Sequence, residues 1–356
     1  MASVDPSDIR FMFDVPVPMR DGVRLSADIY LPAEEGRYPA ILQRTPYDNT
    51  APLWVEVYRY FAQRGYAFVG QDVRGRCDSE GAWVPLMNEA EDGYDTIEWI
   101  ARQPWCDGNV GMMGGSYGGH VQWMAARERP PHLVTLVSTA AAGRWMQEFP
   151  YMNGKIMPYS MWWLNLIGGR TMQQGLPALG SASSKPLFNW KKLLYHRPLR
   201  TLDDAMGRSN TIWKEWLDHP TYDSFWRRLS LEGCFEHIEL PVLHITGWYD
   251  GDQWGELYLY NKMIAHSPSA DKQFLLSGPW THAGTRVPRA ELGGVDFTQA
   301  AVIDINKVHL RWFDYWLKGE QNGQGDDARV KIFTMGRNTW REEATWPPSD
   351  MQITPY

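Results

Sequence analysis

A glycine-rich turn around Ser116 contains the residue types that nucleophilic catalysis requires. The motif Gly-x-Ser116-x-Gly lies between an expected strand, residues 109–115, and an expected helix, residues 117–127. Because a strand and a helix approach closely at such a turn, the flanking positions need glycine, and the hydroxyl is exposed at the carboxyl end of the sheet. The backbone N–H of Tyr117 then begins the helix, where it can stabilise an oxyanion. The alternatives are a structural turn and a phosphate loop, and the latter is disfavoured because no Gly-Lys-Ser/Thr follows.

A serine hydroxyl attacks well only when a base removes its proton and an acid orients that base. In a doubly wound hydrolase these partners follow the serine at the ends of later strands, with the acid before the histidine. Residues 241–250 are predicted to form a strand that ends in Asp250, and residues 274–282 a strand followed by a loop with His282. We therefore predict Ser116 as the nucleophile, His282 as the base and Asp250 as the acid.

The other histidines and the cysteines do not indicate a metal site. His244 lies inside an apolar strand pattern and is expected to be a core histidine, whereas His120 follows the serine on the same helix and would have to fold back to reach it. Neither His-Glu-x-x-His nor paired Cys/His spacing occurs in the sequence. We expect no metal and no cofactor.

The candidate residues need a parallel sheet that brings several strand ends to one edge. Short apolar runs alternate with helical patterns over the first 140 residues and again after residue 240, which is typical of an α/β fold with a mostly parallel, doubly wound sheet. Strands are expected at residues 23–31, 39–44, 66–69, 109–115, 241–246, 273–277 and 329–335, and helices at 53–63, 89–102, 117–127, 254–265 and 299–317.

The alternation breaks between residues 143 and 238. That stretch is rich in Trp, Met, Pro and Gly and has no β-type runs, so we predict a helical cap inserted into the sheet domain. The core is accordingly predicted in two parts, residues 1–142 and 239–320. A polar linker containing glycine follows at residues 319–327.

Composition and charge exclude several classes of partner. The 356-residue chain has 35 Lys and Arg against 42 Asp and Glu, a net charge of −7, which gives no electrostatic footprint for nucleic acid or an anionic membrane. No apolar run approaches the roughly 18 residues that span a bilayer, and the charged N-terminus leaves no room for a signal peptide. Three cysteines without CxxC spacing suit a reducing compartment. We expect a soluble, cytoplasmic protein with a small-molecule partner, and the sequence leaves open whether it forms a homo-oligomer.

Seven further motifs accompany the serine turn in a fixed order along nearly the whole chain. They are VPMRDGVRL at 17–25, RTPYD at 44–48, QDVRG at 71–75, SEG at 79–81, WCDGNVG at 105–111, GWYD at 247–250 and GPWTH at 278–282. Together with Gly-Gly-Ser116-Tyr, they give the chain a resemblance to the CocE/NonD, or Xaa-Pro dipeptidyl-peptidase (S15)-like, serine hydrolases. This family includes cocaine esterases and α-amino acid ester hydrolases.

The resemblance implies an α/β-hydrolase fold and assigns roles at matching positions. It gives Ser116, His282 and Asp250 the nucleophile, base and acid roles, and it makes Tyr47 the second oxyanion donor beside the Tyr117 backbone. A neutral phenol is a good hydrogen-bond donor in a dry site. Chains of this family continue into a C-terminal β-sandwich (jelly roll), so residues 328–356 are predicted to be its truncated beginning.

Substrate-binding residues follow from the same resemblance. Amino-acid-ester-hydrolase members carry acidic residues that bind the substrate ammonium, and Asp252 and Glu148 lie near those positions. Alternatively, Asp252 is the N-cap of the helix at residues 254–265. Four aromatic residues are predicted to line an apolar acyl pocket or to pack within the cap: Phe149, Tyr151, Trp162 and Trp163.

The sequence thus predicts an enzyme, a serine hydrolase that cleaves carboxylic esters or activated amides through an acyl-enzyme. One alternative is an Xaa-Pro dipeptidyl-peptidase, which cuts after proline. An alternative from another class is a non-catalytic binding protein with the α/β-hydrolase fold. The intact catalytic positions weigh against the binding protein.

Overall fold

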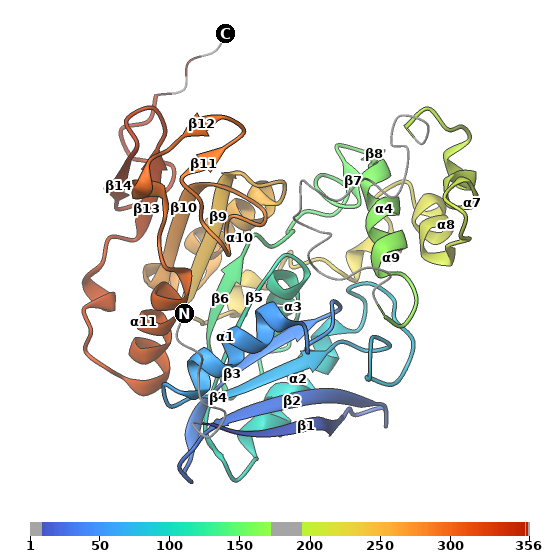
Figure 1. Cartoon of the computed structure of the whole chain (residues 1–356). Coiled ribbons are helices and arrows are strands. Elements are labelled where there is room, and N and C mark those ends of the chain that lie inside the picture. The colour runs from blue at the N-terminus through green and yellow to red at the C-terminus, as the bar shows by residue number, and fades with distance from the viewer. Residues whose placement is uncertain (1–8, 172–193, 353, 355–356) are drawn as a thin grey trace.

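A ten-stranded sheet forms the centre of the computed structural model, which describes residues 9–171, 194–352 and 354 (Figure 1). The strand order is β1-β2-β4-β3-β5-β6-β9-β10-β13-β14. Neighbouring strands from β4 to β13 run parallel, whereas β1, β2 and β14 pair antiparallel at the two edges. The bounds are β1 Ile9–Pro18, β2 Arg24–Pro32, β3 Tyr38–Thr45, β4 Ala67–Asp72, β5 Cys106–Gly115, β6 Leu133–Thr139, β9 Val242–Tyr249, β10 Gln273–Thr281, β13 Val330–Thr334 and β14 Thr339–Glu343.

Helices cover both faces of this sheet, with bounds α1 Pro52–Ala62, α2 Glu89–Ala101, α3 Tyr117–Arg127, α10 Gln253–His266 and α11 Ile305–Lys318. Adjacent residues of β4 show the two layers, because successive side chains of a strand point to opposite faces. Phe68 packs with Phe61 of α1, which in turn contacts Phe313 of α11. Val69 belongs to the other apolar cluster, with Ile97 of α2. The predicted mostly parallel α/β architecture is confirmed.

Several strands depart from the sequence prediction. The patterns missed β1 and β6, although β6 has the β-branched run Leu-Val-Thr-Leu-Val-Ser-Thr. The expected strand near the C-terminus exists as β13, but it is not the start of a β-sandwich within residues 328–356. It pairs with β10 in the main sheet and then with β14. Val330 and Ile332 are buried against the sheet, and local alternation could not say which sheet they would join.

The stretch predicted as a cap, residues 143–238, contains helices joined by irregular segments where it is described, and residues 172–193 of it lie outside the described part. Its helices are α4 Pro158–Ile167, α7 Leu202–Ala205, α8 Thr211–Asp218 and α9 Ser224–Arg227, and they group to one side of the sheet in Figure 1. A short hairpin, β7 Tyr151–Met152 and β8 Lys155–Ile156, was not expected there. Trp163, Trp213, Trp216 and Trp226 are buried between these elements.

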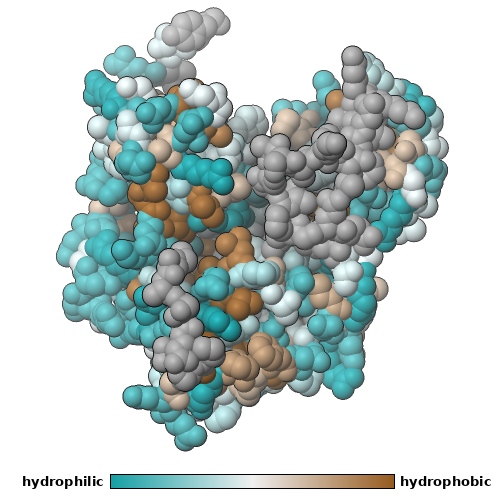
Figure 2. Space-filling model, in the orientation of Figure 1, coloured by the Kyte–Doolittle hydropathy of each residue, from teal (hydrophilic) through white to brown (hydrophobic). Residues whose placement is uncertain are grey.

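The surface is mostly polar. Figure 2 shows hydrophilic residues over much of the visible face, with hydrophobic residues gathered near its middle. Among the helices that the structure describes, none has both the length and the apolar character needed to span a membrane.

Candidate active site

Ser116 lies on a sharp turn between β5 and α3. Its backbone has φ 62° and ψ −122°, a left-handed conformation that costs energy for any residue with a side chain. Gly114 before it has φ 148°, and a Cβ at Gly114 would lie 2.8 Å from the carbonyl oxygen of Gly118. Glycine is therefore required at Gly114, and the strand–turn–helix context is the one that the motif predicts.

Asp250 and His282 follow the carboxyl ends of the neighbouring strands β9 and β10. The Nδ1 atom of His282 lies 2.8 Å from Oδ1 of Asp250. The Asp250 side chain is fully buried, whereas 39% of the His282 side chain is exposed. Burial raises the pKa of Asp250, but the hydrogen bond and charge of His282 outweigh it and leave the pKa below its ordinary value. An ionised carboxylate thus holds Nδ1, which leaves Nε2 of the imidazole to accept a proton.

Tyr47 follows β3 and brings its hydroxyl to the serine turn. The indole Nε1 of Trp163 donates to the Tyr47 hydroxyl oxygen at 3.1 Å. Burial raises the pKa of Tyr47, and hydrogen bonds with Trp163 and Ser116 partly oppose that rise. The phenol is therefore neutral at pH 7 and retains the proton that an oxyanion donor needs.

Tyr117 contributes its backbone to this site, while its side chain is anchored elsewhere. Its hydroxyl donates to Oε1 of Glu89 at 2.6 Å and accepts from the backbone N–H of Leu86 at 2.9 Å. Glu89 in turn forms a buried ion pair with Arg44 at 2.7 Å. The N–H of Tyr117 opens the first turn of α3, where the helix supplies no acceptor. This network holds the Tyr117 side chain at the start of α3, directly after the Ser116 turn. Sequence reasoning did not identify it.

Asp252 occupies the N-cap position of α10, but its side chain makes no capping hydrogen bond. Its Oδ2 atom lies instead 3.7 Å from Nδ1 of His282. Burial and the charge of Asp250 raise the pKa of Asp252 to about 6, although the His282 charge opposes them. The capping alternative is therefore wrong for the side chain, which is a second carboxylate beside the imidazole.

Glu148 is buried and its carboxylate is held by backbone groups. Oε2 accepts from the N–H groups of Gly143 and Arg144 at 3.0 and 3.2 Å, and Oε1 accepts from that of Gly255 at 2.8 Å. Burial and the nearby charge of Asp252 raise the pKa of Glu148 well above its ordinary value. These contacts tie the start of the predicted cap to α10, and an ammonium-binding role for Glu148 stays a prediction.

The four aromatic candidates are separated by the fold. Trp163 contacts Tyr47 directly, and Phe149 packs edge-on against Trp163 with ring centroids 5.4 Å apart. Tyr151 is buried, and its hydroxyl donates to the backbone carbonyl oxygen of Trp216 in α8. Trp162 packs against Tyr159 on α4. Of the four, Trp163 contacts Tyr47, and Phe149 contacts Trp163 in turn.

The histidines set aside by the sequence argument have structural partners. His244 is buried, with Nδ1 2.8 Å from Oε1 of Glu256 and Nε2 3.2 Å from Oε1 of Gln273. It is a satisfied core histidine, as predicted. His120 is also buried, and its Nδ1 lies 3.0 Å from the carbonyl oxygen of Ala142. Burial lowers the pKa of His120 to about 4, so it stays neutral.

The described residues contain one group with the spacing of a metal site, formed by Asp250, Asp252 and His282, whose ligand atoms lie within 4.8 Å of one another. Nδ1 of the histidine is already hydrogen-bonded to Asp250. A metal ion would have to displace that contact. The geometry fits two carboxylates that contact one imidazole nitrogen better than it fits a metal site.

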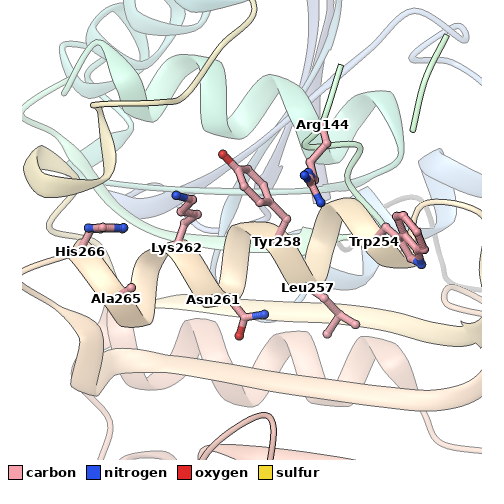
Figure 3. A pocket seen from close by; sticks show the side chains of 8 residues that line it. All are labelled: Arg144, Trp254, Leu257, Tyr258, Asn261, Lys262, Ala265 and His266. Atoms are coloured by element: carbon pink, nitrogen blue, oxygen red, sulfur yellow. The ribbon is translucent and has the colours of Figure 1, made fainter. Parts of the chain in front are cut away.

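A pocket of about 430 Å³ follows the exposed side of α10 (Figure 3). Arg144 and Lys262 lie over the ring of Tyr258 at 5.3 and 5.7 Å from its centroid. Trp254 lines the pocket at the N-terminal end of α10. None of the predicted catalytic residues lines this pocket, so it is separate from the triad.

Comparisons with known proteins find relatives over most of the chain. The model of the X-Pro dipeptidyl-peptidase (S15) family matches residues 21–284. Cocaine esterase of Rhodococcus sp. (strain MB1 Bresler) is 32% identical over 374 residues, which cover 96% of this chain and 61% of that protein. Two solved structures are similar over 98% of this chain. An α-amino acid ester hydrolase matches with TM-score 0.79, 26% identity and 60% of its own chain covered. An aminopeptidase from a marine sediment Thaumarchaeota archaeon matches with TM-score 0.81, 25% identity and 61% of its chain covered. The chain thus spans about three fifths of the length of these relatives.

Proposed function

The chain belongs to the X-Pro dipeptidyl-peptidase (S15) family, and from this premise we propose that it is a serine hydrolase that cleaves carboxylic esters or activated amides through an acyl-enzyme. The observation that carries the proposal is the buried Asp250 hydrogen-bonded to the partly exposed His282, after strands of the same sheet whose strand β5 ends at the strained turn of Ser116. This is the arrangement that turns an alcohol into a nucleophile.

In the proposed reaction, Ser116 Oγ attacks the substrate carbonyl while Nε2 of His282 takes its proton. Asp250 holds Nδ1 and stabilises the imidazolium that forms. The negative charge on the carbonyl oxygen is met by the Tyr47 hydroxyl and the Tyr117 N–H. His282 then protonates the leaving group, and water releases the acyl group by the same steps.

Esters and activated amides are favoured as substrates because the cocaine esterase relative covers nearly the whole chain. Cleavage after proline is the second candidate, supported by the name of the matching family and by the aminopeptidase neighbour. Hydrolysis of an alanyl-prolyl arylamide, compared with that of short-chain aryl esters, separates the two.

The proposal is tested by steady-state hydrolysis of aryl esters by the wild type and by Ser116→Ala. The loss of turnover is expected to be on the order of 10⁶-fold, because a triad fails as a unit. A folded Ser116→Ala protein that retains turnover within tenfold of the wild type would exclude an acyl-enzyme at this residue.

A further inference from the structure

Arg286 is a cation beside the nucleophile. Its guanidinium packs against Gly115, the residue that precedes Ser116, so closely that a Cβ added at Gly115 would overlap Nη2 and lie 2.6 Å from Cζ. Consecutive Cα atoms are about 3.8 Å apart, so the guanidinium lies close to the residue that follows Gly115, which is Ser116. Sequence reasoning did not single out Arg286, since nothing in its local pattern marks it.

The hydrogen bonds of Arg286 leave half of its guanidinium unused. Nη1 donates to the carbonyl oxygen of His282 at 2.5 Å and to Oγ1 of Thr285 at 3.2 Å. Nε and Nη2 have no acceptor among the residues that the structure describes, and no described carboxylate lies within 4.0 Å. The edge that carries Nε and Nη2 is the one that can bind a carboxylate in a bidentate manner.

Two of the other enclosed arginines have carboxylate partners, whereas Arg76 donates to backbone carbonyl oxygens. Arg44 pairs with Glu89 at 2.7 Å and Arg74 pairs with Asp92 at 2.6 Å. Arg286 is enclosed enough that burial lowers its pKa, although arginine stays charged at any physiological pH. The charges of Asp250 and Asp252 partly oppose this lowering, but neither carboxylate forms an ion pair with Arg286. Such a group beside a nucleophile is explained by an anion that arrives with the substrate.

We propose that Arg286 is an anion subsite of the active centre, and that the substrates are esters or amides with a free carboxylate close to the scissile carbonyl. This inference rests on the proposed hydrolase function and narrows its substrate class. The carboxylate belongs either to the acyl group or to the leaving group. In both cases it binds the Nε–Nη2 edge of the guanidinium while Nη1 keeps its contact with the His282 carbonyl.

Two acidic side chains, Asp250 and Asp252, lie near Arg286 and act on its charge. Asp250 stays ionised while it accepts the hydrogen bond of His282, and its charge acts on Arg286. Asp252 lies at Nδ1, which is the side of the imidazole ring away from the reactive Nε2. A substrate carboxylate therefore competes with Asp250 and Asp252 for the charge of Arg286, and it binds at the Nε–Nη2 edge, which neither of them occupies.

The test compares matched ester pairs that differ in one carboxylate. Monoethyl glutarate with ethyl valerate, and monoethyl adipate with ethyl hexanoate, place the charge on the acyl side. The pair 4-acetoxybenzoate and methyl 4-acetoxybenzoate places it on the leaving group. For each pair, kcat/KM is measured with the wild type, Arg286→Gln, Arg286→Lys and, as a matched control on the same loop, the exposed Arg289→Gln.

We expect Arg286→Gln to lower kcat/KM about 10- to 100-fold for the charged member of at least one pair, the usual cost of a charge-assisted hydrogen bond. The neutral members should change by less than about threefold. Arg286→Lys keeps the positive charge but loses the bidentate guanidinium edge, so its kcat/KM for the charged esters should lie between those of the wild type and Arg286→Gln. Arg289→Gln should have the kcat/KM of the wild type. Glutarate should also inhibit ethyl valerate hydrolysis competitively in the wild type, which needs no variant.

Two results would overturn the inference. An equal loss on charged and neutral members in Arg286→Gln would mean that Arg286 only positions His282. A wild type that prefers the neutral member of every pair, and that glutarate does not inhibit, would exclude an anion subsite even if the variants fail to fold. In both cases activity on neutral esters would leave the hydrolase proposal intact, whereas no activity on any ester would contradict that proposal itself.

Discussion

The indole Nε1 of Trp163 donates a hydrogen bond to the hydroxyl oxygen of Tyr47 at 3.1 Å, across 116 residues of sequence. Because the phenol oxygen accepts this bond, its own proton is free to point toward Ser116 and the oxyanion. The contact joins a helix of the predicted cap, α4, to the turn after β3. Arg76 strengthens the same junction by donating to the carbonyl oxygens of Pro46 and Ile167.

The Tyr47 hydroxyl is expected to carry much of the oxyanion stabilisation. Tyr47→Phe keeps the ring and removes the donor, so kcat should fall roughly 10²- to 10³-fold with little change in KM. Steady-state kinetics on a short-chain aryl ester measure this. Turnover within a few-fold of the wild type would remove Tyr47 from the oxyanion hole.

Trp163 is expected to act through Tyr47. Trp163→Phe removes the indole N–H and should lower kcat about 3- to 10-fold, the worth of one hydrogen bond. In a Tyr47→Phe background the same change should have almost no further effect, because the acceptor hydroxyl is gone. Trp226→Phe is the matched control, since that buried indole donates to the carbonyl oxygen of His219 at 2.8 Å. Fully additive losses for Trp163 and Tyr47 would show that the two act independently.

Asp250 is expected to orient the imidazole of His282. Asp250→Asn should lower kcat by about 10⁴-fold, because an amide can hold the ring in the wrong tautomer. The protein should still fold, and its far-ultraviolet circular dichroism should match that of the wild type. A loss below tenfold would indicate that Asp252 can replace Asp250. Asp252 is the alternative acid because its Oδ2 atom lies 3.7 Å from Nδ1 of His282.

Asp252 should make the stability of the fold depend on pH. Its pKa of about 6 in the folded chain lies above the ordinary 3.8, so between these values the unfolded chain has lost the proton that the folded chain keeps. Stability therefore falls as pH rises through this window and levels off above it. Asp252→Asn lacks this penalty, so its free energy of unfolding relative to the wild type should rise between pH 4 and pH 8 by on the order of 1 kcal/mol.

Urea unfolding at the two pH values measures this effect of Asp252. Asp271→Asn, on the surface, is the control and should show no such rise. A relative stability of Asp252→Asn that stays constant or falls with pH would contradict the burial of a protonatable carboxylate beside His282.

Glu148 is expected to be a structural residue whatever else it binds. Glu148→Ala leaves the backbone N–H groups of Gly143, Arg144 and Gly255 without their acceptor and should lower the free energy of unfolding by about 2 kcal/mol or more. Denaturant unfolding measures the loss, with the exposed Glu239→Ala as control. If stability is unchanged and only esters with a free α-amine react more slowly, Glu148 is a ligand-binding residue instead.

The sequence predicted those candidate site residues that a local pattern marks. A glycine-flanked serine between a strand and a helix, and an acid and a histidine after later strands, follow from chain order alone. Tyr47 was identified only through the family resemblance, because a tyrosine after proline has the pattern of an ordinary turn. Arg286 was missed altogether, since its position depends on packing against Gly115 from a distant loop.

The fold shows the same division. The alternating pattern predicted the central strands and their helices, because parallel strands buried on both faces give continuous apolar runs. It gave β13 as a strand but assigned it to a separate β-sandwich. The choice of partner for β13 depends on the edge that β10 offers, and no local pattern contains that information.

The central claim, that Ser116 is an activated nucleophile, is tested most directly by a fluorophosphonate probe followed by peptide mapping of the adduct. The account predicts one covalent adduct on Ser116 in the folded wild type, and its loss in Ser116→Ala and in His282→Ala. A folded wild-type protein that stays unlabelled, or that is labelled at another residue, would contradict it and favour a non-catalytic binding protein on the same fold.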